Sequence, residues 1–158
     1  MGTKTVKFRD WVFEADVELT QQTYANAQVS GAEECTCGNC KNYLAFRDNI
    51  FPDEIKTLFN ELGINYTKES EIITDQKHQN GLYDTSGWFH FKGRILNGKN
   101  AYIPISDTGV TIELTQVADN FLIGFGPGNS LAFFEDKDGL IEVMFQTNIP
   151  WVIDPELE

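Results

Sequence analysis

Three cysteines, Cys35, Cys37 and Cys40, lie within six residues of one another and carry the most reactive side chains of the chain. Thiolates are the soft ligands that zinc prefers, and a C-x-x-C pair can hold one ion from both ends of a tight turn. Gly38 suits such a turn, because glycine accepts positive φ angles without steric cost. The cluster therefore predicts a metal site whose ligands are the three cysteines.

A tetrahedral zinc site needs a fourth ligand, and the chain has only two histidines. The candidates are His90, His78 and a nearby carboxylate such as Glu34, and the sequence leaves the choice among them open. A domain of this size builds a core without the help of an ion. A bound metal would therefore be an addition to the fold rather than a condition for it.

Other uses of the cysteines differ in what each requires. A c-type haem site needs histidine at position 41, which is Lys41, and an iron–sulfur cluster usually needs four cysteines. A thioredoxin-like pair would follow a strand, whereas Cys37 follows a polar stretch. Three idle thiols, a regulatory disulfide and a catalytic thiol at Cys37 or Cys40 stay open beside the metal site.

His90 lies in an unusual run, Gly87-Trp88-Phe89-His90-Phe91. Strand alternation directs Phe89 and Phe91 to the core and sends Trp88 and His90 to the opposite face. We therefore expect His90 outside the core, either beneath the helices or on an exposed strip. Trp88 and His90 would then line a pocket or a partner surface, whereas the plainer interpretation is a sheet face covered by the helices.

Two further patterns are interpreted as turns. Gly124-x-Gly126-x-Gly128 has the spacing of a phosphate-binding loop, but it contains Pro127 and leads into a strand rather than a helix. A hairpin turn is the prediction there. Segment 135–139 resembles the end of a calcium loop, but its first ligand position falls on Phe134, so it is also predicted to be a turn.

The elements that must position these residues follow from hydrophobic periodicity. The stretch 6–13 is predicted to be one strand with a bulge at Arg9-Asp10, where the parity of its apolar residues changes. Helices are expected over three ranges, 17–29, 41–48 and 52–62. The last has apolar residues at i, i+3, i+4 and i+7, and Gly63 provides its end.

After Tyr66 the chain consists of short alternating runs separated by turn residues, which is typical of antiparallel strands. Helices come first and strands later, so the predicted fold class is α+β. We expect an N-terminal strand and two to three helices packed on a mainly antiparallel meander sheet from the C-terminal half. We expect one domain over 1–158, helical from about 16 to 63 and β-rich from about 70 to 153.

The formal net charge of −12 disfavours nucleic-acid and anionic-membrane binding, because both need a basic surface. It permits a basic protein partner, although acidity also serves solubility. No apolar run approaches the roughly 18 residues of a membrane span, and the N-terminus lacks the apolar core of an export signal. Cysteines without an export signal indicate a reducing compartment, so we expect a cytoplasmic protein.

Three segments together resemble a group of small uncharacterised bacterial proteins. They are Trp11-Val12-Phe13-Glu14, the C-x-C-x-x-C-x-N segment that begins at Cys35, and the G-W-F-H-F strand at 87–91. The resemblance covers most of the chain. It implies a bacterial, cytoplasmic origin, and since the group has no known activity it assigns no catalytic residue.

Three hypotheses for function follow. The first is a non-enzymatic binding or interaction protein for an unknown protein or small-molecule partner, with a structural zinc or thiol cluster at the three cysteines. The second is a thiol-dependent enzyme that uses Cys37 or Cys40 with His90 as its base. The third is an acidic inhibitor or immunity-type protein for a basic partner, which requires acidic residues to gather on one face.

Overall fold

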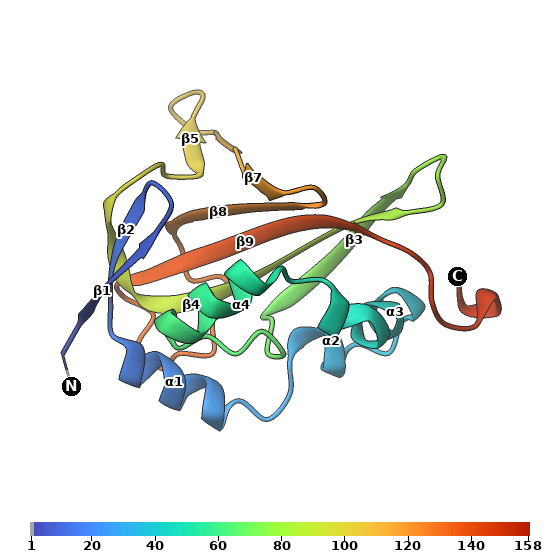
Figure 1. The fold of residues 1–158 in the computed structure, drawn as a ribbon, viewed down its shortest axis with the longest axis horizontal. Helices are drawn as coiled ribbons and strands as arrows, with labels where there is room; N and C mark the ends of the chain where they lie inside the picture. The colour runs from blue at the N-terminus through green and yellow to red at the C-terminus, as the bar shows by residue number, and fades with distance from the viewer. Residues whose placement is uncertain (1) are drawn as a thin grey trace.

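A computed structural model describes residues 2–158, and a seven-stranded antiparallel sheet forms the centre of the fold (Figure 1). The strand order is β1-β2-β4-β9-β8-β7, and β3 pairs with β4. These strands are β1 (Lys4–Phe8), β2 (Trp11–Ala15), β3 (Glu71–Lys77), β4 (Tyr83–Asn97), β7 (Thr115–Ala118), β8 (Phe121–Pro127) and β9 (Leu140–Ile149). A separate hairpin consists of β5 (Tyr102–Pro104) and β6 (Val110–Ile112). The predicted α+β class is confirmed.

The helices gather along one side of the sheet in Figure 1. They are α1 (Val17–Asn26), the one-turn α2 (Gly31–Glu34), α3 (Gly38–Phe46) and α4 (Asp53–Leu62), with the short 3₁₀ turns η1 (Arg47–Asn49) and η2 (Pro155–Leu157). The Asp16 side chain caps α1. Gly63, with φ of 88°, ends α4 as predicted. α3 begins earlier than the predicted 41–48 helix, because the side chain of Cys37 caps it.

The apolar stretch 6–13 is a hairpin, so its prediction as one bulged strand was wrong. β1 and β2 pair antiparallel with Phe8 opposite Trp11, and Arg9 and Asp10 form the turn between them. Arg9 has φ of 52°, the left-handed conformation that tight hairpin turns require. A turn that reverses the chain changes which alternate residues face the core, and a bulge has the same effect. The alternation of apolar residues alone therefore does not distinguish a hairpin from a bulged strand.

The core between the helices and the sheet is aromatic. Phe51 lies just before α4, and its ring centroid is 5.0 to 5.9 Å from those of five other rings: Phe59, Tyr66, Phe89, Phe121 and Phe145. The predicted apolar face of α4 is fully buried in the same core. Ring pairs of this kind add about 0.5–1.5 kcal/mol each beyond burial of their area. This packing fixes the helices on one face of the sheet.

Gly124 and Gly126 lie inside β8, so their prediction as a hairpin turn was wrong. The large apolar residues of β8 alternate toward the core, and the glycines therefore face the other side of the sheet. A Cβ at Gly124 would lie 2.6 Å from Leu114 Cδ2, and one at Gly126 would collide with the Tyr102 ring. The glycines thus make room for segment 100–114 to pack against the sheet.

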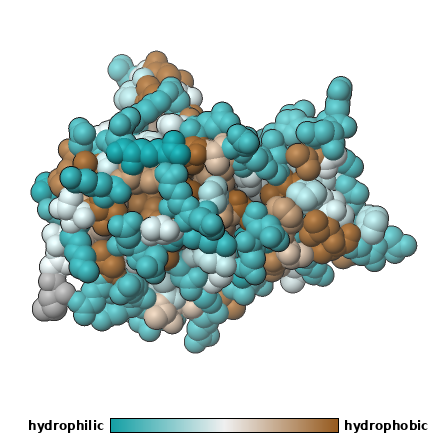
Figure 2. Space-filling model, in the orientation of Figure 1, coloured by the Kyte–Doolittle hydropathy of each residue, from teal (hydrophilic) through white to brown (hydrophobic). Residues whose placement is uncertain are grey.

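The face shown in Figure 2 is largely hydrophilic, and hydrophobic side chains gather over α3 and at the tip of the β5–β6 hairpin. At that tip Ile105 and Val110 are exposed. Within residues 2–158, none of the helices combines the length and the apolar character needed to cross a membrane.

Candidate metal centre

The three cysteines lie where α2 leads into α3, and the fold brings their sulfurs together. Cys35 follows α2, Cys37 caps the N-terminus of α3, and Cys40 lies in the first turn of α3. The three Sγ atoms all lie within 4.8 Å of one another, and those of Cys35 and Cys37 are 3.0 Å apart. A disulfide bond is only about 2.05 Å long, so these are free thiols arranged as a cluster.

The thiols differ in their tendency to ionise. Cys37 is exposed, and its pKa is lowered by hydrogen bonds from the Cys35 thiol and from the Cys40 N–H, which lies 3.4 Å from its Sγ. The positive end of the α3 dipole acts in the same direction. Burial, together with the two neighbouring thiols, raises the pKa of Cys40. The cluster thus favours a thiolate at Cys37 and disfavours one at Cys40.

The donor set fits one soft metal ion. Zinc with Zn–S bonds of about 2.3 Å separates its sulfurs by about 3.8 Å, which is within the 4.8 Å span of the cluster. Cys35 and Cys37, now 3.0 Å apart, would separate by about 0.8 Å on binding. Backbone N–H groups point at both of these sulfurs from 3.4 Å and would support bound thiolates.

A buried ion pair holds the loop that carries the cysteines. The Glu69 carboxylate accepts hydrogen bonds from the Ala32 N–H of α2 and from Arg47 Nη1, just after α3, each at 3.3 Å. Burial raises the pKa of Glu69, and hydrogen bonding to Ser30 and the charge of Arg47 partly oppose it. Because the Glu69 carboxylate hydrogen-bonds both α2 and the residue that follows α3, it fixes the distance between these two helices, which flank the cysteines.

The C-terminal segment packs on the same helix. The Asn42 side chain donates to the Pro150 carbonyl at 3.0 Å and accepts from the Val152 N–H at 2.7 Å. A Cβ at Gly38 would collide with the Leu157 carbonyl oxygen. Gly38 opens α3 without a positive φ, so the predicted glycine turn was wrong, and this glycine instead makes room for the C-terminal segment.

Neither histidine belongs to the cysteine cluster. The His90 ring has Nδ1 3.3 Å from Ser70 Oγ and Nε2 3.1 Å from Glu142 Oε2. His78, near the β3–β4 turn, has Nε2 2.7 Å from Asp84 Oδ1. Among the described residues, the group of adjacent ligand atoms contains no histidine and no carboxylate. The thiol-enzyme hypothesis therefore loses His90 as its catalytic base.

His90 is a core residue, contrary to expectation. It is only 1% exposed, and the Tyr24 hydroxyl of α1 bonds both its backbone N–H and its carbonyl oxygen, at 2.9 and 3.0 Å. Alternation does place its side chain opposite Phe89 on the strand, but Ser70 and Glu142 cover the ring there. Periodicity shows which face a residue occupies, not whether distant segments return to cover that face.

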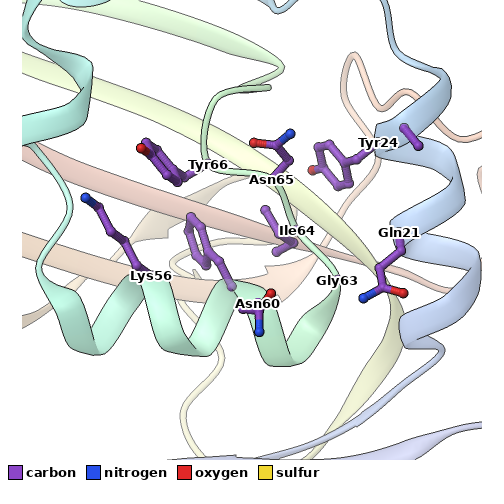
Figure 3. A pocket seen from close by; sticks show the side chains of 10 residues that line it. Gln21, Tyr24, Lys56, Asn60, Gly63, Ile64, Asn65 and Tyr66 are labelled. Carbon is purple, nitrogen blue, oxygen red and sulfur yellow. The ribbon is translucent and has the colours of Figure 1, made fainter.

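A hollow of about 430 Å³ opens between α1, α4 and segment 63–66 (Figure 3). Gln21 and Asn60 line it from the two helices, and Lys56 Nζ lies 5.0 Å from the centre of the Tyr66 ring. Its described lining residues include no cysteine, histidine or carboxylate. It therefore lacks the side chains that usually bind a metal ion.

Sequence reasoning missed Glu142, Tyr102 and Ser70, which form a polar chain with His90 that is buried except at Tyr102. One signal was available, because Glu142 interrupts the apolar run 140–145, where a buried carboxylate must find a partner. No local pattern indicates Tyr102, since it reaches Glu142 from a hairpin 40 residues away.

Fold and site together define an α+β protein with a three-cysteine cluster at the junction of two helices. Comparisons with protein families, with curated proteins and with solved structures gave no match. The resemblance to small bacterial proteins therefore stays a prediction, and the function has to be inferred from the residues themselves.

Proposed function

We propose that this is a cytoplasmic, non-enzymatic binding protein in which Cys35, Cys37 and Cys40 hold one zinc ion. The closeness of three thiols, all within 4.8 Å, is the observation that carries the proposal. Zinc supplies the charge that lets the buried Cys40 ionise, since metal binding and thiol deprotonation are coupled. A reducing compartment keeps such thiols free for metal. The ion joins the end of α2 to the start of α3 and has a structural role.

We propose Glu34 as the fourth ligand. It directly precedes Cys35 and is exposed, so its carboxylate is free to turn toward the sulfurs. His90 and His78 are already bonded to Glu142 and Asp84. Four protein ligands are typical of structural zinc, whereas catalytic zinc keeps one position for water or substrate.

Elemental analysis tests the metal directly. Protein purified without chelator or metal-affinity resin is expected to contain about one zinc per chain. Its three thiols are expected to react with a thiol reagent only after a chelator removes the zinc. Cobalt(II) in place of zinc is expected to give the intense sulfur-to-cobalt charge-transfer absorption of a site with three thiolates.

Matched variants separate the cluster from its surroundings. Cys37→Ser is expected to abolish stoichiometric zinc binding, whereas Asn39→Ala, which alters a side chain between the same cysteines, is expected to retain it. Glu34→Gln is expected to retain the cobalt–sulfur absorption with weaker affinity. Less than about 0.2 zinc per chain, with three freely titratable thiols before any chelator is added, would remove the metal hypothesis.

A further inference from the structure

The sheet face opposite α4 carries a groove of about 490 Å³. Phe89 and Phe145 of the central strands face α4 through the aromatic core, so their neighbours Trp88 and Met144 face the other way. Trp88 and Met144 are register partners and form the floor of the groove, with Leu122 of β8 beside them. A volume of this size is in the range of sites for small molecules, about 300–1,000 Å³.

Segment 100–114, which packs on the sheet at Gly124, forms one wall of the groove. Leu114 lines it, and this side chain packs against β8 at Gly124, where a Cβ would lie 2.6 Å from Leu114 Cδ2. Across the groove the Trp88 indole N–H donates to the Ser130 carbonyl at 3.0 Å, which fixes the indole ring. The groove is therefore a shaped apolar site with fixed walls.

A carboxylate with its own polar support lies at the groove. The side chain of Glu142 is 9% exposed, and its Oε2 is 3.1 Å from His90 Nε2. Its Oε1 accepts a hydrogen bond from the Tyr102 hydroxyl. Burial opposes ionisation, but the interactions with His90, Tyr102 and the Ser130 backbone together outweigh it, and the pKa of Glu142 lies below its ordinary value. A carboxylate can accept about four hydrogen bonds, so His90, Tyr102 and the Ser130 backbone leave capacity for one more.

The charge of the groove selects the class of ligand. Among the described residues that line it, Glu142 alone has an ionisable side chain, and it is acidic. The whole chain carries a net charge of −12, which repels anions and attracts cations. The indole of Trp88 adds a flat apolar surface of the kind that attracts organic cations.

We propose that this groove binds a small organic amine. The protonated nitrogen pairs with the Glu142 carboxylate, and the apolar body lies against Trp88 and Met144. His90 and Tyr102 keep the carboxylate ionised and in place. The groove is lined by none of the cysteines, so this proposal does not depend on the metal content of the protein.

Methyl NMR of methionine provides a local test. The chain has two methionines, so protein labelled at the methionine methyl carbon gives a spectrum of two signals, and Met144→Leu assigns the one in the groove. Phenethylamine is the probe, 2-phenylethanol its neutral analogue and 3-phenylpropionate its anionic analogue. Phenethylamine is expected to shift the Met144 signal saturably, with affinity about tenfold above that of the alcohol. The anion is expected to cause no shift.

Two variants locate the binding. Glu142→Gln is expected to reduce the affinity for phenethylamine about tenfold and to leave the alcohol unaffected, whereas Glu135→Gln, an equal charge change on an exposed residue, is expected to alter neither. Trp88→Leu is expected to weaken the amine and the alcohol alike. If Glu142→Gln does not fold, the comparison of amine with alcohol on the unaltered protein still tests the charge requirement.

Three results would overturn the proposal. One is no shift of the Met144 signal up to about 1 mM phenethylamine. Another is equal affinity for the amine and the alcohol, and the third is unchanged amine binding in a folded Glu142→Gln variant. The same titration on Cys37→Ser is expected to match the unaltered protein, so a failure of the metal site and a failure of the groove are distinguishable.

Discussion

Replacing Asn42 with alanine tests how the C-terminal segment is held on α3. Asn42 is 2% exposed, and its side chain bonds the Pro150 carbonyl at 3.0 Å and the Val152 N–H at 2.7 Å. Each hydrogen bond contributes about 0.5–1.5 kcal/mol net, and a buried partner left unpaired costs about 1–3 kcal/mol. If the segment stayed in place, the two orphaned groups would together cost about 2–6 kcal/mol.

Release of the segment is the less costly response. Val152 and Leu157 are 47% and 48% exposed, so their packing contributes little, and the pair of Glu158 with Lys77 is exposed to solvent. Once the segment leaves, the Pro150 and Val152 backbone groups regain water. The losses are the two hydrogen bonds of Asn42, the ring contact of Trp151 with Tyr83 at 5.7 Å and the exposed hydrogen bonds of Glu158. We therefore expect a fall of about 1.5–4.5 kcal/mol in the free energy of unfolding, together with detachment of residues 150–158.

Urea unfolding measures the free energy, and amide hydrogen exchange measures the attachment of residues 150–158. Asn60→Ala is a matched control, because it removes an exposed asparagine side chain from another helix and is expected to change neither measurement. Asn42→Asp keeps the acceptor for Val152 but loses the donor to Pro150, and it is expected to release the segment as well. Unchanged exchange protection of Val152 in Asn42→Ala would refute the reasoning.

Two further changes test the core and the buried carboxylate. Phe51→Ala removes a ring packed against five others and is expected to cost about 3–5 kcal/mol in urea unfolding, whereas Ile105→Ala, at an exposed tip, should stay within about 0.5 kcal/mol. The pKa of Glu142 is lowered in the fold, so its contribution is present above the unfolded value of about 4.3 and is lost as pH falls through the folded value. Between pH 7 and 3, Glu142→Gln is therefore expected to lose less stability than the unaltered protein, and equal losses would contradict this.

Local signals predicted the parts of the fold that depend on local physics. α4 carries an apolar stripe and ends at a glycine with positive φ, and both features are written in the residues of the helix itself. The cysteine cluster was predictable for the same reason, because its members are adjacent in sequence and a helix cap brings Cys37 toward Cys40. The sequence placed the cluster between two helices, but it did not predict α2 at Gly31–Glu34 or the start of α3 at Gly38.

The environment of His90 and the groove were not predictable in this way. Alternation assigned His90 to the correct face, but the residues that bury it are 20 and 52 positions away in the chain. Likewise, Gly124 and Gly126 match the pattern of a glycine-rich turn. Their actual role, to leave space on a strand for segment 100–114, depends on that distant segment packing against them. A sequence pattern cannot distinguish these cases, because the partner that decides between them is non-local.

Two buried carboxylates connect the cysteine site with the groove. Glu69 is tied to α2 and to Arg47 below the cysteine loop, while Glu142 is tied to His90 at the groove. Ser70 directly follows Glu69 and hydrogen-bonds the other ring nitrogen of His90. Glu69 and Ser70 therefore link the polar group at the cysteine site to the polar group at the groove. Buried charges cost stability unless they are paired, and apolar residues would fill the same space at lower cost. Their occurrence at both candidate sites is what we expect where buried ionisable groups are kept to fix the geometry of a site.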